Sequence, residues 1–266
     1  MNTIPHHHDF DIHTDYHRLH ALRLSPPQAA NHPTLVFLHE GLGSIRQWSH
    51  FPEQLCDLTH LPGLVYERHG HGQSETLTHP RSCDYLHQEA QDYLPAVLST
   101  CHITEPPILF GHSDGGSIAL LYAAACPDKV RAIVIEAAHV FVEEASLYGI
   151  RAACQSFEQG HLYRKLQRYH GDNTETMFRG WSNIWLHPDF RDWRIEKELQ
   201  AITCPVLIVQ GEDDEYGTRA QVDTIANSIT GPSEILWLPH CGHTPHHQLR
   251  ETVLEATAGF INQYIC

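Results

Sequence analysis

Short apolar runs alternate with amphipathic stretches along most of this 266-residue chain. Compact apolar runs bounded by polar, glycine or proline residues are typical of buried strands, whereas apolar residues three and four positions apart are typical of helices. The runs that predict strands are residues 34–38, 63–66, 107–110, 130–135, 206–209 and 234–238, with two more short strands expected within 10–24. The stretches that predict helices are residues 48–61, 85–101, 219–229 and 249–264, with another directly after Ser113. This alternation predicts a mostly parallel sheet with helices on both faces, an α/β fold.

The alternation stops between residues 139 and 202. Strand-like runs disappear from this segment, helical spacing takes over, and aromatic residues gather, among them Trp181, Trp185 and Trp193. A helical insertion of this kind, placed after the sixth predicted strand, is expected to lie over the sheet as a lid. We therefore predict a core made of residues 1–138 and 203–266, and a helical lid made of residues 139–202.

A serine stands at the sharpest turn that the pattern predicts. Residues 111–115 read Gly-His-Ser-Asp-Gly, between a predicted buried strand and an Ala- and Leu-rich helix. A nucleophile on so tight a strand-to-helix turn needs glycines two positions before and after it, because larger side chains there would collide. The helix that starts at the serine also points free N–H groups at the reaction centre. Ser113 is therefore the candidate nucleophile.

Two later strand ends supply an acid and a histidine. Ligands of an open parallel sheet bind beyond the carboxyl ends of its strands, where Asp214 and His243 are both expected. The order nucleophile, acid, histidine is that of an α/β-hydrolase triad, in which histidine takes the serine proton and a carboxylate orients the histidine. We assign Ser113, Asp214 and His243 to these roles. The alternatives left open are Asp213 and Glu136 for the acid, and His240, His246 and His247 for the base.

Acyl transfer also requires donors for the developing oxyanion. One donor is expected to be the backbone N–H of Asp114, directly after the nucleophile. The other is expected in the loop of residues 39–44, where Leu42 is the best placed.

The composition argues against two classes of partner. Asp and Glu number 32 against 17 Lys and Arg, which gives a formal charge of −15. This charge opposes binding to nucleic acid or to an anionic membrane. No apolar run approaches membrane-spanning length, and residues 1–20 lack the apolar centre of a signal peptide. A small-molecule substrate and a cytoplasmic location are therefore expected, and the oligomeric state is left open.

Histidine and cysteine are the residue types that could indicate metal binding. The eight cysteines include no Cys-x-x-Cys pair, so their spacing predicts neither a zinc site nor a disulfide framework. Part of the chain's 24 histidines gathers near the N-terminus, namely His6, His7, His8, His13, His17 and His20. Metal capture by this cluster is one interpretation, and a solvated terminus is the simpler one. No metal ion and no cofactor are expected at the active site.

Several motifs in order make the chain resemble the α/β-hydrolase superfamily over nearly its whole length. They are the loop at 39–44, Gly70-x-Gly72-x-Ser74, the Gly-His-Ser-Asp-Gly-Gly turn at 111–116, Gly-Glu-Asp-Asp at 211–214 and Gly-His at 242–243. Within the superfamily the chain is most similar to the valacyclovir-hydrolase (biphenyl-hydrolase-like) group, on residues 41–44, 113–116 and 138–142. In that group the aspartate after the nucleophile contacts the α-ammonium of an amino-acid ester. The resemblance implies this role for Asp114.

The oxyanion loop departs from the pattern of the family. Many members read His-Gly there, whereas Glu40 stands between His39 and Gly41 in this chain. A bare carboxylate near an oxyanion would oppose the reaction. Glu40 is therefore expected to point away, paired with Arg46 or Arg68, or else to help bind a cationic substrate.

The motifs together indicate a serine hydrolase that cleaves a small carboxylic ester through an acyl-enzyme. Trp181, Trp185 and Trp193 are candidate residues of an acyl or alcohol pocket, with packing inside the lid as the equal alternative for each. The second hypothesis is a carbon–carbon hydrolase of a ring-fission dienoate, whose anionic substrate Arg68 or Arg151 would have to balance. A thioesterase and a non-catalytic ligand-binding protein are further alternatives. A dehalogenase or epoxide hydrolase would need Asp in place of Ser113.

Overall fold

The computed structural model describes residues 7–26 and 33–264, and His6 lies outside them. The strands are β1 (His7–His13), β2 (Arg18–Leu24), β3 (Leu35–Leu38), β4 (Gly63–Tyr66), β5 (Ile108–His112), β6 (Ala132–Glu136), β7 (Val206–Gly211) and β8 (Ser233–Leu238). The helices are α1 (Phe51–Thr59), α2 (Tyr85–Gln88), α3 (Leu94–Thr100), α4 (Asp114–Ala125), α5 (Glu144–Glu158), α6 (His161–His170), α7 (Thr174–Trp185), α8 (Arg219–Ser228), α9 (Pro245–Gln248) and α10 (Arg250–Asn262).

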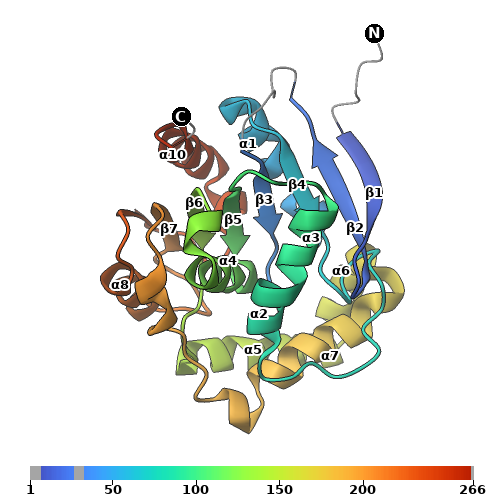
Figure 1. Ribbon diagram of the computed structural model, residues 1–266. Helices are drawn as coiled ribbons and strands as arrows, with labels where there is room; N and C mark the ends of the chain where they lie inside the picture. Colours follow the sequence, from blue (N-terminus) through green and yellow to red (C-terminus); the bar gives the residue numbers. More distant parts are fainter. Residues whose placement is uncertain (1–6, 27–32, 265–266) are drawn as a thin grey trace.

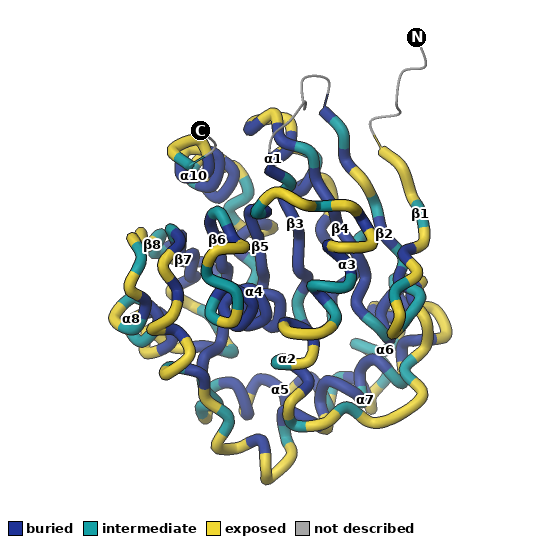
Figure 2. Tube along the Cα trace, in the orientation of Figure 1, coloured by how far each residue is buried: buried dark blue, intermediate teal, exposed yellow. Residues whose placement is uncertain are grey.

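The strands form one sheet in the order β1-β2-β4-β3-β5-β6-β7-β8 (Figure 1). The β1–β2 and β2–β4 pairs are antiparallel, and the pairs from β4 to β8 are parallel. The central strands are buried along their whole length, whereas β1 is mostly exposed (Figure 2). Strands buried on both faces read as continuous apolar runs, which is why they could be predicted. The predicted α/β fold class is confirmed.

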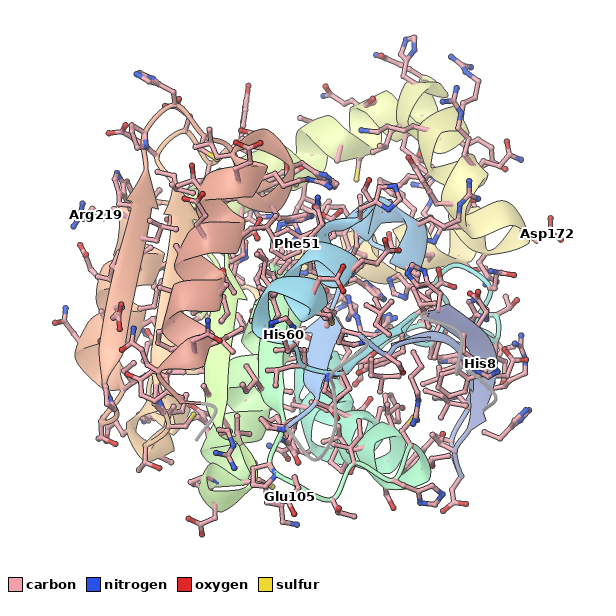
Figure 3. The ribbon with its side chains drawn as sticks, turned by 90° about the horizontal axis from the view of Figure 1, so that it is seen from above. His8, Phe51, His60, Glu105, Asp172 and Arg219 are labelled. Carbon is pink, nitrogen blue, oxygen red and sulfur yellow. The ribbon has the colours of Figure 1, made fainter. Side chains whose placement is uncertain are left out.

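Each face of the sheet carries its own hydrophobic core. Phe110 of β5 packs on one face in a cluster with residues of α1 and α10, such as Phe51 and Phe260. Leu109, the residue before Phe110, packs on the other face in a cluster with residues of α3, α4 and α8. Seen from above, α1 with Phe51 lies over the strands beside α10 (Figure 3). Successive side chains of a strand point to opposite faces, so one apolar strand supplies both cores.

The helix predicted at 85–101 is interrupted by a π-helical turn. α2 and α3 are joined by the π-helix η2 (Glu89–Tyr93), and Pro95 follows at the start of α3. Proline lacks an N–H, and its ring collides with the carbonyl one turn earlier, so the helix widens there.

The helices α5, α6 and α7 lie between β6 and β7 in the sequence and gather at the ends of the parallel strands to which the arrows point (Figure 1). Their aromatic side chains join the core that α4 shares, and Phe157 stacks on Phe178 with ring centroids 3.8 Å apart. This placement brings the α5–α7 segment over the edge of the sheet where Ser113 stands. The division into a core and a separate lid remains a prediction. No helix of the described residues combines the length and the apolar character needed to span a membrane.

Candidate active site

The turn between β5 and α4 holds Ser113 in strained backbone. Its φ of 52° and ψ of −115° lie in a region that side chains other than glycine rarely adopt. The Ser113 N–H donates to the Glu136 carbonyl of β6 at 2.8 Å, which ties the turn to the neighbouring strand. A Cβ at Gly115 would lie 1.9 Å from the Leu38 carbonyl oxygen, and one at Gly111 would lie 2.2 Å from the Gly115 carbonyl oxygen. Only glycine lets the chain pass this closely on either side of the serine.

Asp214 and His243 are brought together from the ends of β7 and β8. Nδ1 of His243 lies 2.8 Å and 3.0 Å from the two carboxylate oxygens of Asp214. The N–H of Tyr216 also donates to Asp214, at 2.8 Å. Burial alone would raise the pKa of the Asp214 carboxyl, but the charge and hydrogen bond of His243 hold that pKa well below its usual range. Asp214 is therefore an anion that orients the imidazole.

The same pairing changes the pKa of the histidine. Burial alone would lower the pKa of His243, but the carboxylate of Asp214, with smaller contributions from Glu40 and Glu215, raises that pKa to about 9. An imidazole next to several carboxylates holds its proton firmly once it has taken it. A carboxylate in this position would stabilise the imidazolium that forms if His243 takes up the proton of a serine.

Ser113 and His243 line one pocket under the α5–α7 segment. The pocket has about 390 Å³ of empty space, and the two side chains are nearly buried, at 8% and 6% exposed. The loop after β3 contributes residues 40–42, and α5 and α7 contribute Ile150, Trp181 and Trp185. Ser113 and His243 thus share a pocket beyond the carboxyl ends of parallel strands, and Asp214 joins them through its contact with His243, as expected for an open α/β sheet.

The alternative acids lie elsewhere. Asp213 is exposed beside Asp214. Glu136 is fully buried, and its carboxylate lies 2.7 Å from Nδ1 of His246 rather than near His243. This second carboxylate–histidine pair also accepts the backbone N–H of His246 at 3.0 Å. Glu136 therefore anchors the loop that carries His243 to the end of β6.

The alternative bases are accounted for as well. His246 is paired with the carboxylate of Glu136. The remaining candidates, His240 and His247, are exposed. Nε2 of His247 lies 2.7 Å from the carbonyl oxygen of Gln47 at the surface. Only His243 among these histidines lines the pocket with Ser113.

The oxyanion loop is held by side chains that bind its carbonyl groups. Nδ1 of His39 donates to the carbonyl of Glu40 at 2.7 Å, and its Nε2 accepts the N–H of Arg68 at 3.0 Å. His170, the last residue of α6, donates from Nε2 to the carbonyl of Leu42 at 3.0 Å and accepts the N–H of Gly72 at Nδ1. Both imidazoles are neutral in this arrangement. These side chains bind the carbonyl groups of Glu40 and Leu42. The backbone N–H of Leu42 is therefore left for the pocket that Leu42 lines.

Glu40 does not point away, and the expected pairing with Arg46 or Arg68 is wrong. Glu40 lines the pocket with Ser113 and His243. Arg68 donates to the backbone carbonyl of Glu40 at 2.8 Å, and Arg46 donates to the carbonyl of Arg168 at 2.8 Å. The reason is that Arg68 is buried beneath the loop, where carbonyl groups and other carboxylates lie within its reach. Burial raises the pKa of the Glu40 carboxyl.

Asp114 combines a bonded and an unbonded oxygen. Its Oδ2 accepts the hydroxyl of Tyr85 at 2.8 Å and lies 3.6 Å from the buried guanidinium of Arg68. Its Oδ1 is buried and has no hydrogen-bond partner among the described residues. The residue is 2% exposed and lines the pocket. A buried carboxylate oxygen without a partner is costly, so a donor supplied by a ligand would stabilise it.

Two of the three candidate tryptophans line the pocket, and Trp193 does not. Trp181 and Trp185 line the pocket and are also buried in the core of the α5–α7 segment. The indole of Trp181 lies so close to Gly41 that a Cβ there would be 2.3 Å from the ring. The indole N–H of Trp185 donates to the hydroxyl of Tyr85 at 2.8 Å. Trp193, by contrast, stacks on Phe190.

Sequence reasoning missed the residues that reach the site from other elements. His139 and Tyr216 line the pocket, and Tyr85 and His170 position other residues there. A single tyrosine or histidine in a chain rich in both carries no local signal. His139 was visible only as the first residue of the predicted lid.

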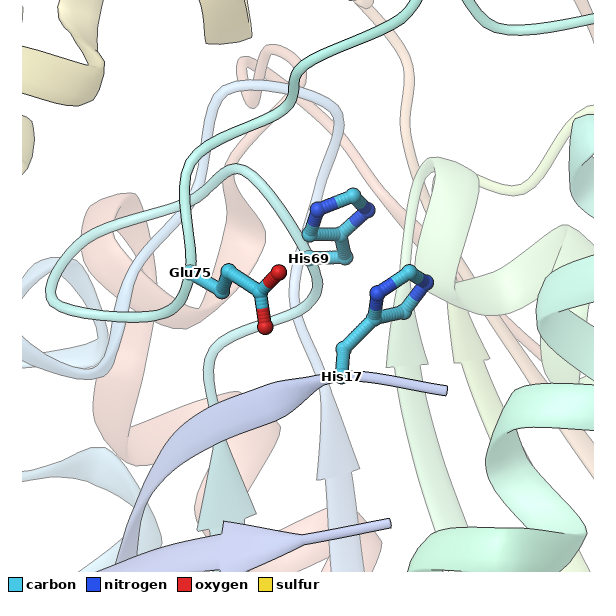
Figure 4. Close-up of side chains that lie close together, drawn as sticks. All are labelled: His17, His69 and Glu75. Atoms are coloured by element: carbon cyan, nitrogen blue, oxygen red, sulfur yellow. The ribbon is translucent and has the colours of Figure 1, made fainter. Parts of the chain in front are cut away.

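One histidine of the N-terminal cluster meets two groups from a distant loop. Figure 4 shows His17 beside His69 and Glu75, and one possible ligand atom from each lies within 4.8 Å of the others. The two imidazoles stack with centroids 3.6 Å apart and planes at 10°. In nearly parallel stacked rings the lone pairs lie in separate planes, so both could point at one ion only after a ring rotates. The observed arrangement is therefore one of packing.

A mostly parallel sheet with a strained serine turn at β5, a carboxylate after β7 and a histidine after β8 defines the α/β-hydrolase class. The chain matches the model of the Alpha/beta hydrolase family over residues 35–256 and belongs to that family.

Among its relatives, the chain is 27% identical over 191 residues to serine hydrolase BPHL of Mus musculus. The match covers 69% of this chain and 63% of that relative, so the chain spans less than two thirds of its length. It is 24% identical over 240 residues to a pimeloyl-[acyl-carrier protein] methyl ester esterase of Nitrosomonas europaea, covering 81% and 90% of the two chains. The structure of a proline iminopeptidase of Mycobacterium smegmatis superposes with a TM-score of 0.75 at 19% identity over 97% of this chain and 98% of that one.

Proposed function

We propose that the protein is a serine hydrolase that cleaves small carboxylic esters through an acyl-enzyme. The observation that carries this proposal is the pairing of Asp214 with His243 at 2.8 Å in a pocket that Ser113 also lines. The names of two relatives, a serine hydrolase and a methyl ester esterase, agree with it.

The proposed reaction uses each group in turn. His243 takes the proton from the hydroxyl of Ser113 as the serine oxygen attacks the ester carbonyl, and Asp214 stabilises the imidazolium that forms. The backbone N–H groups of Asp114 and Leu42 stabilise the oxyanion. His243 then protonates the departing alcohol, and water hydrolyses the acyl-enzyme by the same steps. Because serine is the nucleophile, no cofactor or metal ion is required.

Asp114 is proposed to bind an ammonium group on the acyl side of the ester. The support is its buried Oδ1, which has no partner among the described residues, in a pocket that no described lysine or arginine lines. The other oxygen is already held by Tyr85. The motif resemblance to amino-acid ester hydrolases gives the same assignment.

The carbon–carbon hydrolase hypothesis is less well supported. A dienoate substrate is an anion, and it would meet the carboxylates of Glu40 and Asp114 in the pocket. Arg68 is buried beneath the oxyanion loop and bound to its carbonyl groups, and Arg151 is exposed on α5. Neither lines the pocket, so the charge that such a substrate needs is not supplied by either arginine.

The setting proposed for the enzyme is the cytoplasm, with a small molecule as its partner. The cysteines agree with a reducing compartment, since the described ones are all free thiols and several are buried among apolar side chains.

The direct test is a panel of p-nitrophenyl esters from acetyl to octanoyl, run with the wild type and Ser113→Ala. Release of p-nitrophenol by the wild type alone establishes the serine esterase. Because the pocket is small, short acyl chains are expected to have the highest kcat/KM. Equal rates for the two proteins would place the hydrolysis outside Ser113 and contradict the proposal.

A further inference from the structure

Glu40 is held by its backbone at the wall of the pocket. Its backbone carbonyl accepts hydrogen bonds from His39 at 2.7 Å, from Arg68 at 2.8 Å and from the N–H of Gly43 at 3.1 Å. Its side chain lines the pocket and makes no ion pair or hydrogen bond within the described part of the chain. The backbone at Glu40 is thus fixed, and its partly exposed carboxylate has no partner among the described residues.

The position of Glu40 relative to His243 assigns it to one side of the ester. A carboxylate oxygen of Glu40 and ring nitrogens of His112 and His243 all lie within 4.8 Å of one another. His243 protonates the leaving alcohol, so the alcohol oxygen must lie beside its imidazole. Groups attached two or three bonds beyond that oxygen therefore come within reach of Glu40.

Asp114 occupies a different wall. Its carboxylate is anchored to Tyr85 of α2, which in turn accepts the indole N–H of Trp185 of α7. No contact within the described residues links it to His243. The pocket therefore has two separate anionic walls, one beside the leaving-group histidine and one at the tryptophan of α7.

The charges around Glu40 leave room for a cation. Arg46 and Lys165 line a second cavity that Glu40 also borders, and neither of these cations lines the pocket of Ser113. Other groups near enough to interact electrostatically with Glu40 include the carboxylates of Asp114 and Glu136, the Tyr216 ring and the imidazoles of His112 and His243. A metal ion held by Glu40, His112 and His243 would occupy the lone pair of His243 that the reaction needs. An ammonium would neutralise Glu40 and leave that lone pair free.

We propose that Glu40 forms an anionic subsite for the alcohol side of the ester and selects substrates whose leaving group carries an ammonium two carbons from the ester oxygen. The inference rests on the proposed ester hydrolysis and adds a leaving-group specificity to it. It also explains how a carboxylate can stand beside an oxyanion hole: the substrate's own cation neutralises it when the pocket is filled.

The test uses two pairs of esters that differ only in charge. In the first pair, 2-(dimethylamino)ethyl acetate and 3-methylbutyl acetate differ in the alcohol. In the second, L-alanine methyl ester and methyl isobutyrate differ in the acyl group. The ratio of kcat/KM within each pair, at pH 7, reports the preference for the cation. The proteins are the wild type, Glu40→Gln, Asp114→Asn and, as a control, Glu158→Gln, which removes an exposed charge at the end of α5.

The expected result is a separation of the two ratios. Glu40→Gln lowers the first ratio about 10- to 100-fold, the range for a lost charge-assisted hydrogen bond, and has a much smaller effect on the second. Glu158→Gln leaves both ratios at their wild-type values. Since glutamine has the shape of glutamate, folding is checked by the melting temperature of each variant.

Three outcomes would overturn the inference. Equal losses in both ratios would show a general negative field in place of an alcohol-side subsite. A wild type that hydrolyses the neutral esters as well as the charged ones would show that Glu40 selects nothing, while the esterase itself would stand. Absence of hydrolysis of all four esters and of the p-nitrophenyl esters would reject the proposed function and this inference with it.

A second measurement separates a carboxylate near His243 from one that only shapes the loop. The negative charge of Glu40 contributes to the raised pKa of His243, so its removal should move the acidic limb of the kcat/KM profile to lower pH. An unmoved limb in Glu40→Gln would contradict the placement of the carboxylate beside the histidine.

Discussion

At the scale of single residues, the site depends on which carboxylate meets which histidine. Two buried pairs lie at neighbouring strand ends, Asp214 with His243 and Glu136 with His246. Only the first pair belongs to the pocket of Ser113. The second pair holds the loop that carries His243, so in the proposed reaction the first pair would act on the reacting groups and the second would act by position.

The first prediction tests this division. Asp214→Asn is expected to reduce kcat about 10⁴-fold, because the amide favours the wrong tautomer of His243. Asp213→Asn, which alters the exposed neighbour, is the matched control and should retain wild-type activity. Ester hydrolysis under saturating substrate measures both. Near-normal turnover in Asp214→Asn, together with its loss in Glu136→Gln, would show that the acid is Glu136.

At the scale of elements, the site is built where backbone segments approach so closely that only glycine fits between them. The turn from β5 to α4 passes over the end of β3 at Gly115. From the other side, α6 reaches the oxyanion loop through the single imidazole of His170. The geometry of the nucleophile and of the oxyanion loop thus depends on contacts between elements far apart in the sequence.

The second prediction concerns the close approach at Gly115. Gly115→Ala should destabilise the protein by about 1–3 kcal/mol or more, because the new methyl group would meet the backbone carbonyl of Leu38. Gly259→Ala in α10 is the control, since a Cβ there meets nothing within 4 Å and the helix gains up to about 1 kcal/mol. Urea denaturation of both variants measures the difference. Equal stabilities would mean that the turn can relax around the methyl group.

The third prediction concerns the link from α6 to the oxyanion loop. His170→Ala removes the donor to the Leu42 carbonyl and the acceptor for the Gly72 N–H. We expect a fall in kcat of about 10-fold or more, since the oxyanion donor is no longer held, with a smaller change in KM. His161→Ala, at the exposed start of the same helix, should behave as the wild type. A change in KM alone would indicate a role in substrate binding.

At the scale of the whole molecule, a group of buried neutral histidines makes stability depend on pH. Burial lowers the pKa of His112 to about 3 and that of His170 to about 4, and it holds the pKa values of His39, His71 and His246 well below the usual value of 6.5. Between these values and 6.5 the unfolded chain binds more protons than the folded one. Acid therefore favours the unfolded state.

The fourth prediction follows from that difference. The stability that these buried neutral histidines contribute should be fully present above pH 6.5 and should fall steadily as the pH drops toward 4. His243 acts in the opposite direction: because its folded pKa is raised to about 9, its contribution is present below pH 6.5 and is lost as the pH rises through 9. Urea midpoints measured from pH 4 to 10 should therefore be highest near neutrality. A midpoint that stays constant from pH 7 down to 5 would contradict this account.

The sequence alone determined the strands, the tight turn at Ser113 and the order of the proposed catalytic residues along the chain. Buried parallel strands are continuous apolar runs, and the tight turn at Ser113 requires glycine at fixed spacing, so both leave a local signal. The predicted strands are all present within the described residues, with small shifts of their ends.

Only the tertiary structure showed that Asp214, and not Glu136, pairs with His243, that Glu40 lines the pocket, and that His170 and Tyr85 reach the site. The physical reason is that these features depend on the direction of side chains across separate elements. Glu40 could be expected to pair with Arg68, because opposite charges attract. The guanidinium of Arg68 instead donates to carbonyl groups of the loop, and Glu40 lines the pocket. The spacing of residues along the chain does not show where a side chain points or which distant residues it contacts.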